Sequence, residues 1–79
     1  MNEFRKTYIL YTSCKHGNPK DYICTLKSNK SKIMDETINI LALKYGNVKV
    51  IESLHDIKNK ITWFRKKLSK YPTFVLIEQ

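Results

Sequence analysis

The sequence predicts one small α+β domain, in which a four-stranded mixed sheet packs against two helices in the order β-β-α-β-α-β. Two segments rich in β-branched and aromatic residues flank a Gly-Asn-Pro turn, two later segments place apolar residues at helical spacing, and a short apolar run closes the chain. Because 79 residues are too few for two ordinary domains, residues 1–79 are expected to form a single unit.

An antiparallel hairpin is expected over about residues 7–27, where two strand-like segments are separated by turn-forming residues. A turn centred on its Gly-Asn pair would place Tyr11 opposite Cys24 and Ile9 opposite Leu26, on a common face. A slip of one residue would move this apolar set to the other face of the sheet, so the register is left open.

A first helix is expected over about residues 31–45, with Ser31 as its N-cap. Apolar side chains then recur along one side of this helix at positions i, i+4, i+7 and i+11. They are Met34, Ile38, Leu41 and Tyr45. Gly46 follows at the position where helices commonly end in a left-handed residue, which indicates the C-terminus.

A short third strand is expected over residues 48–52, and a second helix over about residues 54–70 with Ser53 as its cap. The second helix has the most regular apolar spacing in the chain, at positions 0, 3, 7, 10 and 14. These residues are Leu54, Ile57, Ile61, Phe64 and Leu68. Pro72 lies just beyond this segment, and helices usually end before a proline.

Residues 73–78 predict a final strand inside the sheet, because their four consecutive apolar residues lack polar alternation. Strands that are joined through helices are usually parallel, so a mixed sheet is expected. The order of the strands, and whether the two helices share one face, are left open.

The composition indicates a basic protein that works through its surface. Lys and Arg number 15 against 7 Asp and Glu, a formal net charge of +8, and all but two of the cations are Lys. Lysine attracts a polyanion without the planar fork that arginine offers to a base edge. Lys, Asn and Ile are also the residues that an AT-rich genome encodes, so solvated surface of no special function explains the charge about equally well.

Several classes of protein are not expected. The chain has no apolar run long enough to span a membrane, no secretory signal at its start, and two cysteines whose spacing matches neither a redox pair nor a zinc ribbon. It also has no phosphate-binding loop, no dinucleotide fingerprint and no clustered carboxylates. We therefore expect a cytoplasmic location, no membrane contact, and neither a metal nor a cofactor.

Two groups of residues are candidates for contact with nucleic acid or another partner. One combines a partly exposed tryptophan with cations, and the alternative for it is a ring at the edge of the helix–sheet interface with lysines near a helix end. Its members are Trp63, Arg65, Lys66, Lys67 and Lys70. The other is the hairpin tip and the segment after it, where Tyr8, Tyr11 and Tyr22 would offer stacking faces on an open sheet or else fill the core. Its cations and histidine are Lys15, His16, Lys20, Lys27, Lys30 and Lys32.

Catalysis is a minor alternative. Cys14 and His16 are two residues apart and of the types used in nucleophilic catalysis, but they straddle the predicted turn. His16 and His55 would suit acid–base cleavage of RNA in a small ribonuclease-like toxin, although nothing in their spacing selects that pairing.

The main expectation is therefore a non-enzymatic binding protein whose Lys-rich surface engages nucleic acid or a nucleoprotein complex. The short, Lys/Ile/Asn-rich profile without motifs also resembles small accessory proteins of phages and other mobile elements. That resemblance implies, as an alternative, an inhibitor or adaptor that binds a host nucleic-acid-processing protein. An exposed terminal strand would also allow pairing with a second copy, so a homodimer is a further expectation.

Overall fold

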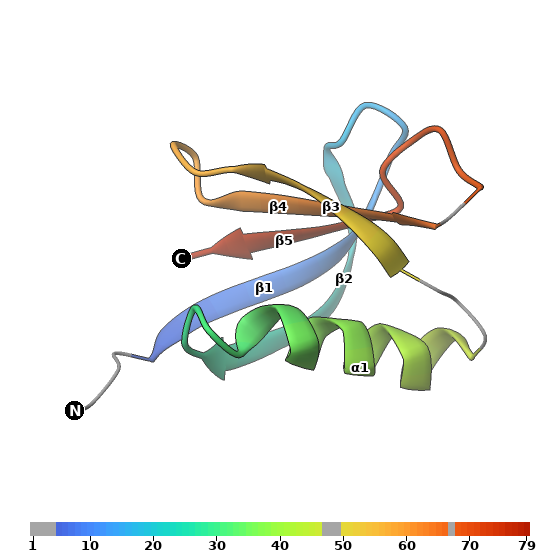
Figure 1. Cartoon of the computed structure of the whole chain (residues 1–79). Coiled ribbons are helices and arrows are strands. Elements are labelled where there is room, and N and C mark those ends of the chain that lie inside the picture. Colours follow the sequence, from blue (N-terminus) through green and yellow to red (C-terminus); the bar gives the residue numbers. More distant parts are fainter. Residues whose placement is uncertain (1–4, 47–49, 67) are drawn as a thin grey trace.

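The computed structural model describes residues 5–46, 50–66 and 68–79, which form five strands and one helix (Figure 1). Along the chain these elements are β1 (Lys6–Ser13), β2 (Pro19–Ser28), α1 (Ile33–Tyr45), β3 (Val50–Asp56), β4 (Ile61–Lys66) and β5 (Phe74–Glu78). None of the described residues belongs to a helix that is long and apolar enough to cross a membrane.

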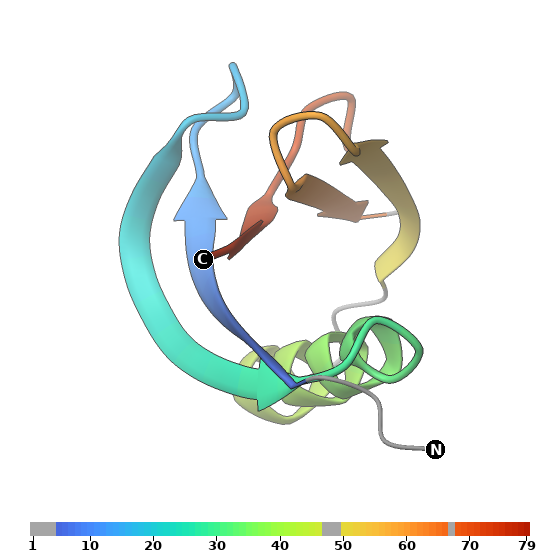
Figure 2. The same cartoon turned by 90° about the vertical axis from the view of Figure 1, so that its left-hand side faces the viewer.

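The strands form one five-stranded sheet in the order β2-β1-β5-β4-β3, and every neighbouring pair is antiparallel. The sheet is strongly curved, and α1 lies across its open side (Figure 2). The predicted four-stranded mixed sheet with two helices is therefore wrong. The expected parallel pairing fails because α1 connects β2 to β3, which lie at opposite edges of the sheet and do not pair.

The largest error concerns the second helix, because most of residues 54–70 belongs to a β-hairpin made of β3 and β4. A tight turn joins these strands: the Asn59 side chain and main-chain amide bind the Asp56 carboxylate, and Lys60 takes a left-handed φ of 59°. The predicted strand 48–52 corresponds to the start of β3, and residues 48 and 49 lie outside the described residues. Strand pairing with β5 on one side and β3 on the other explains why β4 is not helical.

The N-terminal hairpin forms as predicted, but its register differs by one residue. Leu10, not Tyr11, lies opposite Cys24, and Tyr8, not Ile9, lies opposite Leu26. Tyr8 and Leu10 therefore face the core, while Ile9 and Tyr11 point to the other side of the sheet.

The helix α1 agrees closely with its prediction, and Gly46 ends it with a positive φ of 68°. Its start is organised differently. Lys32 occupies the N-cap position without a side-chain cap, and the Asn29 side chain accepts hydrogen bonds from the Lys32 amide and the Ser31 hydroxyl. Asn29 therefore satisfies a main-chain donor at this end, a role that the sequence did not predict for it.

The hydrophobic core lies between α1 and the concave face of the sheet. Its buried members are Tyr8, Leu10, Ile33, Leu41, Phe64, Phe74 and Leu76. The predicted placement of the last strand inside the sheet is confirmed, because β5 is the central strand.

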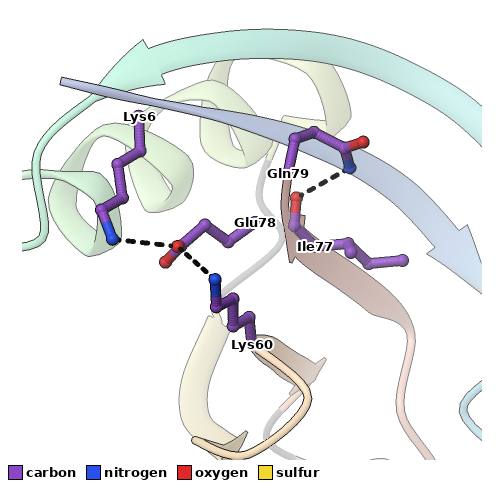
Figure 3. Close-up of polar contacts among 5 residues, drawn as sticks. All are labelled: Lys6, Lys60, Ile77, Glu78 and Gln79. Carbon is purple, nitrogen blue, oxygen red and sulfur yellow. Dashed lines mark hydrogen bonds and ion pairs between the residues drawn. The ribbon is translucent and has the colours of Figure 1, made fainter.

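An ion cluster fastens the end of β5 to two other segments (Figure 3). The Glu78 side chain, only 8% exposed, lies 3.1 Å from Lys6 Nζ of β1 and 3.7 Å from Lys60 Nζ of the β3–β4 turn. Gln79 adds a hydrogen bond from its side-chain amide to the Ile77 carbonyl. The cluster therefore marks one end of the sheet, and the tip of the β1–β2 hairpin marks the other.

Candidate nucleic-acid interface

The convex face of the sheet carries a row of large side chains that runs from one edge to the other. Strand pairing aligns Tyr22 of β2, Tyr11 of β1, Val75 of β5, Trp63 of β4 and Leu54 of β3. We call these five residues the convex row. Because α1 packs on the concave face, no described helix covers them.

Burial changes along the convex row. Val75 at its centre is fully buried, Tyr11 and Trp63 beside it are half-buried, and the outer residues Tyr22 and Leu54 are 62% and 54% exposed. Tyr11 and Tyr22 meet edge to face, with their ring centroids 6.3 Å apart. The row therefore combines a packed centre with accessible rings and an accessible leucine.

The tip of the β1–β2 hairpin is held against Trp63. The indole Nε1 donates a 2.8 Å hydrogen bond to the Gly17 carbonyl. The tip itself is a compact turn, in which the Gly17 amide binds the Cys14 carbonyl and Gly17 takes a φ of 89°. Because a side chain at Gly17 would collide with the indole, glycine allows this close approach.

The loop between β4 and β5 lies at the same end of the sheet as the hairpin tip (Figure 1). A main-chain hydrogen bond of 2.9 Å from Ser13 to Thr73 connects the two segments. Beside Trp63 the loop helps to form a small pocket that is open to solvent. The described residues that line it are Leu54, Trp63, Phe64, Arg65, Lys70 and Pro72. We call it the Trp63 pocket.

The structure brings parts of the two predicted groups to one end of the sheet. From the hairpin tip come the exposed residues Lys15, His16 and Lys20, and from β4 and its loop come Trp63, Arg65 and Lys70. We call this region the tip end. The two parts of the tip end are distant in the sequence, since the hydrogen-bonded residues Gly17 and Trp63 are 46 positions apart.

Three of the remaining predicted lysines lie away from the tip end. Lys27 lies near the far end of β2, and Lys30 and Lys32 follow it in the approach to α1. Lys66 is exposed at the end of β4. Lys67 lies outside the described residues.

Leu54 and Pro72 also line the site, although their sequence pattern predicted a helix face and a helix end. The alternating residues of Ile61–Arg65 could have indicated this arrangement, because a strand places Ile61, Trp63 and Arg65 on the same side of the sheet. The three tyrosines were expected either to fill the core or to offer stacking faces, and the structure shows both placements. Tyr8 is in the core, whereas Tyr11 and Tyr22 are on the convex face.

The structure adds little support for the catalytic pairings of Cys14 with His16 and of His16 with His55. His16 is exposed in the hairpin tip, whereas His55 lies three strands away from β1, in β3, and its Nδ1 is 2.6 Å from the Thr62 hydroxyl. The main-chain amides of His16 and then Asn18 lower the pKa of the Cys14 thiol. Those contacts come from the main chain, so no imidazole is assigned as a base for Cys14.

Among the described residues, no three His, Cys, Asp or Glu side chains gather in a way that would hold a metal ion. Comparison with known proteins found no matching family model, no similar curated protein and no similar solved structure. The tip end and the convex row are therefore the features from which a function can be inferred.

Proposed function

We propose that this protein is a non-enzymatic binding protein that engages nucleic acid through its convex face, mainly at the tip end. The observation that carries the proposal is the convex row, in which Tyr22, Tyr11 and Trp63 lie on a sheet face that no described helix covers. Cations from the hairpin tip and the β4–β5 loop border the same region.

Aromatic rings and lysines supply complementary parts of such an interface. Aromatic side chains on an open antiparallel sheet stack unpaired bases, and each stacked base contributes without requiring a particular sequence. Lysines neutralise phosphates and release their counterions, which supplies affinity and makes binding depend on salt. The surplus of Lys over Arg fits a surface that attracts the backbone and does not read base edges.

The first experiment measures binding to nucleic acid at two salt concentrations. Labelled single strands of about 12 nucleotides, as DNA and as RNA, and the matching duplexes are titrated with the protein. Contact with about three phosphates of a single strand predicts roughly 20-fold weaker binding at about 200 mM than at about 50 mM salt. Absence of binding to all of these probes at low salt would contradict the proposal.

Two triple variants of equal charge show where the contact lies. The first removes cations of the tip end and is Lys15→Gln, Lys20→Gln, Lys70→Gln. The second removes exposed cations at the opposite end of the molecule and is Lys30→Gln, Lys32→Gln, Lys58→Gln. The first is expected to reduce the slope of log affinity against log salt by about two for a single strand, and the second to change it little. Equal losses would show that the charge acts over the whole surface.

A second candidate is an inhibitor or adaptor that binds a host nucleic-acid-processing protein. Exposed apolar side chains near the Trp63 pocket favour it, since Leu54 is 54% exposed and Tyr71 is 53% exposed. Binding of this kind would be nearly insensitive to salt and would be lost on Leu54→Ser, which leaves the net charge unchanged. A pull-down at low and high salt, with the wild-type and Leu54→Ser proteins, separates this candidate from the first.

A further inference from the structure

The Trp63 pocket has a lining that favours one kind of occupant. The pocket is small and open to solvent, so a ligand would lie against its walls and not be enclosed by them. The walls combine the indole of Trp63 with the apolar side chains of Leu54 and Pro72. A flat ring can therefore stack on the indole with its edge against these apolar walls.

The charges at the pocket favour a ring that carries an anion. Arg65 and Lys70 belong to its lining, and no carboxylate is among the described lining residues. The Arg65 guanidinium lies 3.4 Å from the Ser69 carbonyl, a contact that holds it beside the loop. An apolar slot with two adjacent cations is complementary to a nucleobase together with its phosphate.

The indole is also fixed in advance. Its hydrogen bond to the Gly17 carbonyl sets the orientation of the ring, and Val75 packs next to Trp63 across the strand pair. A ring that is already ordered loses less conformational entropy when a ligand binds.

We propose that the Trp63 pocket binds one unpaired base of a single-stranded nucleic acid, while Arg65 and Lys70 face the neighbouring phosphates. The proposal rests on the proposed function and makes it more specific, because it names single strands as the ligand. A base inside a duplex is stacked and paired, so it enters such a pocket only at the cost of being extruded. The protein therefore selects single strands over duplexes.

The test uses Trp63 itself as the probe, because it is the only tryptophan in the chain. A single strand of about 12 thymidines is compared with a strand of abasic sites that has the same number of phosphates. We expect the thymidine strand to bind at least about fivefold more tightly and to change the Trp63 fluorescence, whereas the abasic strand leaves the fluorescence nearly unchanged. The matching duplex is expected to behave like the abasic strand.

A pair of leucine variants shows whether the pocket is responsible. Leu54→Ser alters the pocket wall at a residue that is already exposed, and Leu43→Ser makes the same change on the solvent side of α1, where the leucine is 87% exposed. Leu54→Ser is expected to remove most of the preference for thymidine over the abasic strand, and Leu43→Ser to preserve it. Thermal unfolding of both variants confirms that each is folded.

The outcomes distinguish this proposal from the one it rests on. Equal, salt-dependent binding of the thymidine and abasic strands would overturn the base pocket and leave the charge-based function standing. Equal binding of single strand and duplex, with the same fluorescence change, would overturn the selection of single strands. Absence of binding by every probe at low salt would overturn both proposals.

Discussion

The contact between Trp63 and Gly17 is a single hydrogen bond that determines how the hairpin tip meets the convex face. The indole Nε1 lies 2.8 Å from the Gly17 carbonyl oxygen, and a Cβ built on Gly17 would also lie 2.8 Å from that nitrogen. Gly17 also has a φ of 89°, a backbone angle that residues with a side chain rarely adopt. Both the space and the backbone therefore require glycine here.

Replacing Gly17 by alanine is expected to destabilise the protein by about 2–3 kcal/mol, from a left-handed backbone and a collision with the indole. Gly46→Ala is the matched control, because Gly46 also has a positive φ but a Cβ there would meet nothing within 4 Å. That variant strains the backbone alone, at a φ of 68° and a ψ of −120°, and should lose about 1–3 kcal/mol. Urea unfolding gives both values, and a loss for Gly17→Ala below about 1 kcal/mol would show that the indole does not hold the tip in place.

The phenol of Tyr8 is a second residue whose environment has a measurable consequence. The side chain is 5% exposed, and its hydroxyl has no hydrogen-bond partner among the described residues. Burial, and secondarily the charge of Glu78, raise the pKa of this phenol, while Lys6 acts in the opposite direction. The folded protein therefore favours the neutral phenol.

A raised pKa in the folded state makes stability depend on pH at the alkaline end. Above about pH 10 the unfolded chain loses the Tyr8 proton while the folded chain retains it, so Tyr8 lowers stability as pH rises beyond that value. Tyr8→Phe should abolish this part of the loss and, by removing a buried hydroxyl without a described partner, leave stability at pH 7 equal or higher. Urea midpoints of both proteins at about pH 8 and about pH 10.5 provide the measurement. A parallel decline in the two proteins would contradict the assignment to Tyr8.

Among the elements, the β3–β4 hairpin shows how one sequence pattern can suit two structures. The apolar residues from Leu54 to Leu68 match a helical period, yet Ile57 is 78% exposed and Leu68 is 95% exposed. Phe64, from the same pattern, is almost completely buried because it faces the core from β4. In the sheet, only part of this pattern contributes to the core.

Three alanine variants distinguish the hairpin from the helix that the pattern predicted. In the hairpin, Ile57→Ala and Leu68→Ala should each change the free energy of unfolding by less than about 0.5 kcal/mol, because both side chains are exposed. Phe64→Ala should cost about 3–5 kcal/mol. Losses of about 2 kcal/mol or more for Ile57→Ala would instead indicate that this residue is buried, as the helix requires.

Local signals were sufficient for some elements. The turn residues around Gly17, the left-handed residue Gly46 after α1 and the apolar run of β5 each identify an element from neighbouring residues alone. The identity of β4 depends on its pairing with β5, which follows it by a loop, and with β3. Register was not predictable for a related reason, because both faces of β1 carry apolar residues.

The candidate site was predictable only in part. The unusual combination of Trp63 with Arg65 and Lys70 is visible in the sequence, and so is the basic hairpin tip. Their approach to each other depends on the strand order, which brings β4 within one strand of β1. No local sequence pattern predicts the strand order. The Trp63–Gly17 contact and the place of Leu54 in the lining of the Trp63 pocket could therefore be seen only in the fold.

Considered as a whole, the molecule has two unlike faces. The concave face holds the core and α1, together with the buried carboxylate of Glu78. On the convex side, Asp56 is placed far from the tip end, in the β3–β4 turn, where the Asn59 side chain lowers its pKa. The described residues that line the Trp63 pocket include Arg65 and Lys70 and no carboxylate, whereas the exposed Asp21 lies beside Lys20 in the hairpin. An anion is therefore expected to approach at the pocket.

The reactivity of the two cysteines provides a test of this asymmetry that requires no substitution of a charged residue. Cys14 lies in the hairpin tip, where main-chain amides of His16 and Asn18 lower the pKa of its thiol, while burial raises the pKa of Cys24 on the concave face. At neutral pH the thiolate fraction of Cys14 is larger, so iodoacetamide should modify Cys14 faster than Cys24. Bound single-stranded DNA is expected to slow the reaction of Cys14 and to leave the slow reaction of Cys24 unchanged, as followed by mass spectrometry of the two cysteine peptides. Protection of neither cysteine by a strand that demonstrably binds would place the contact away from the tip end.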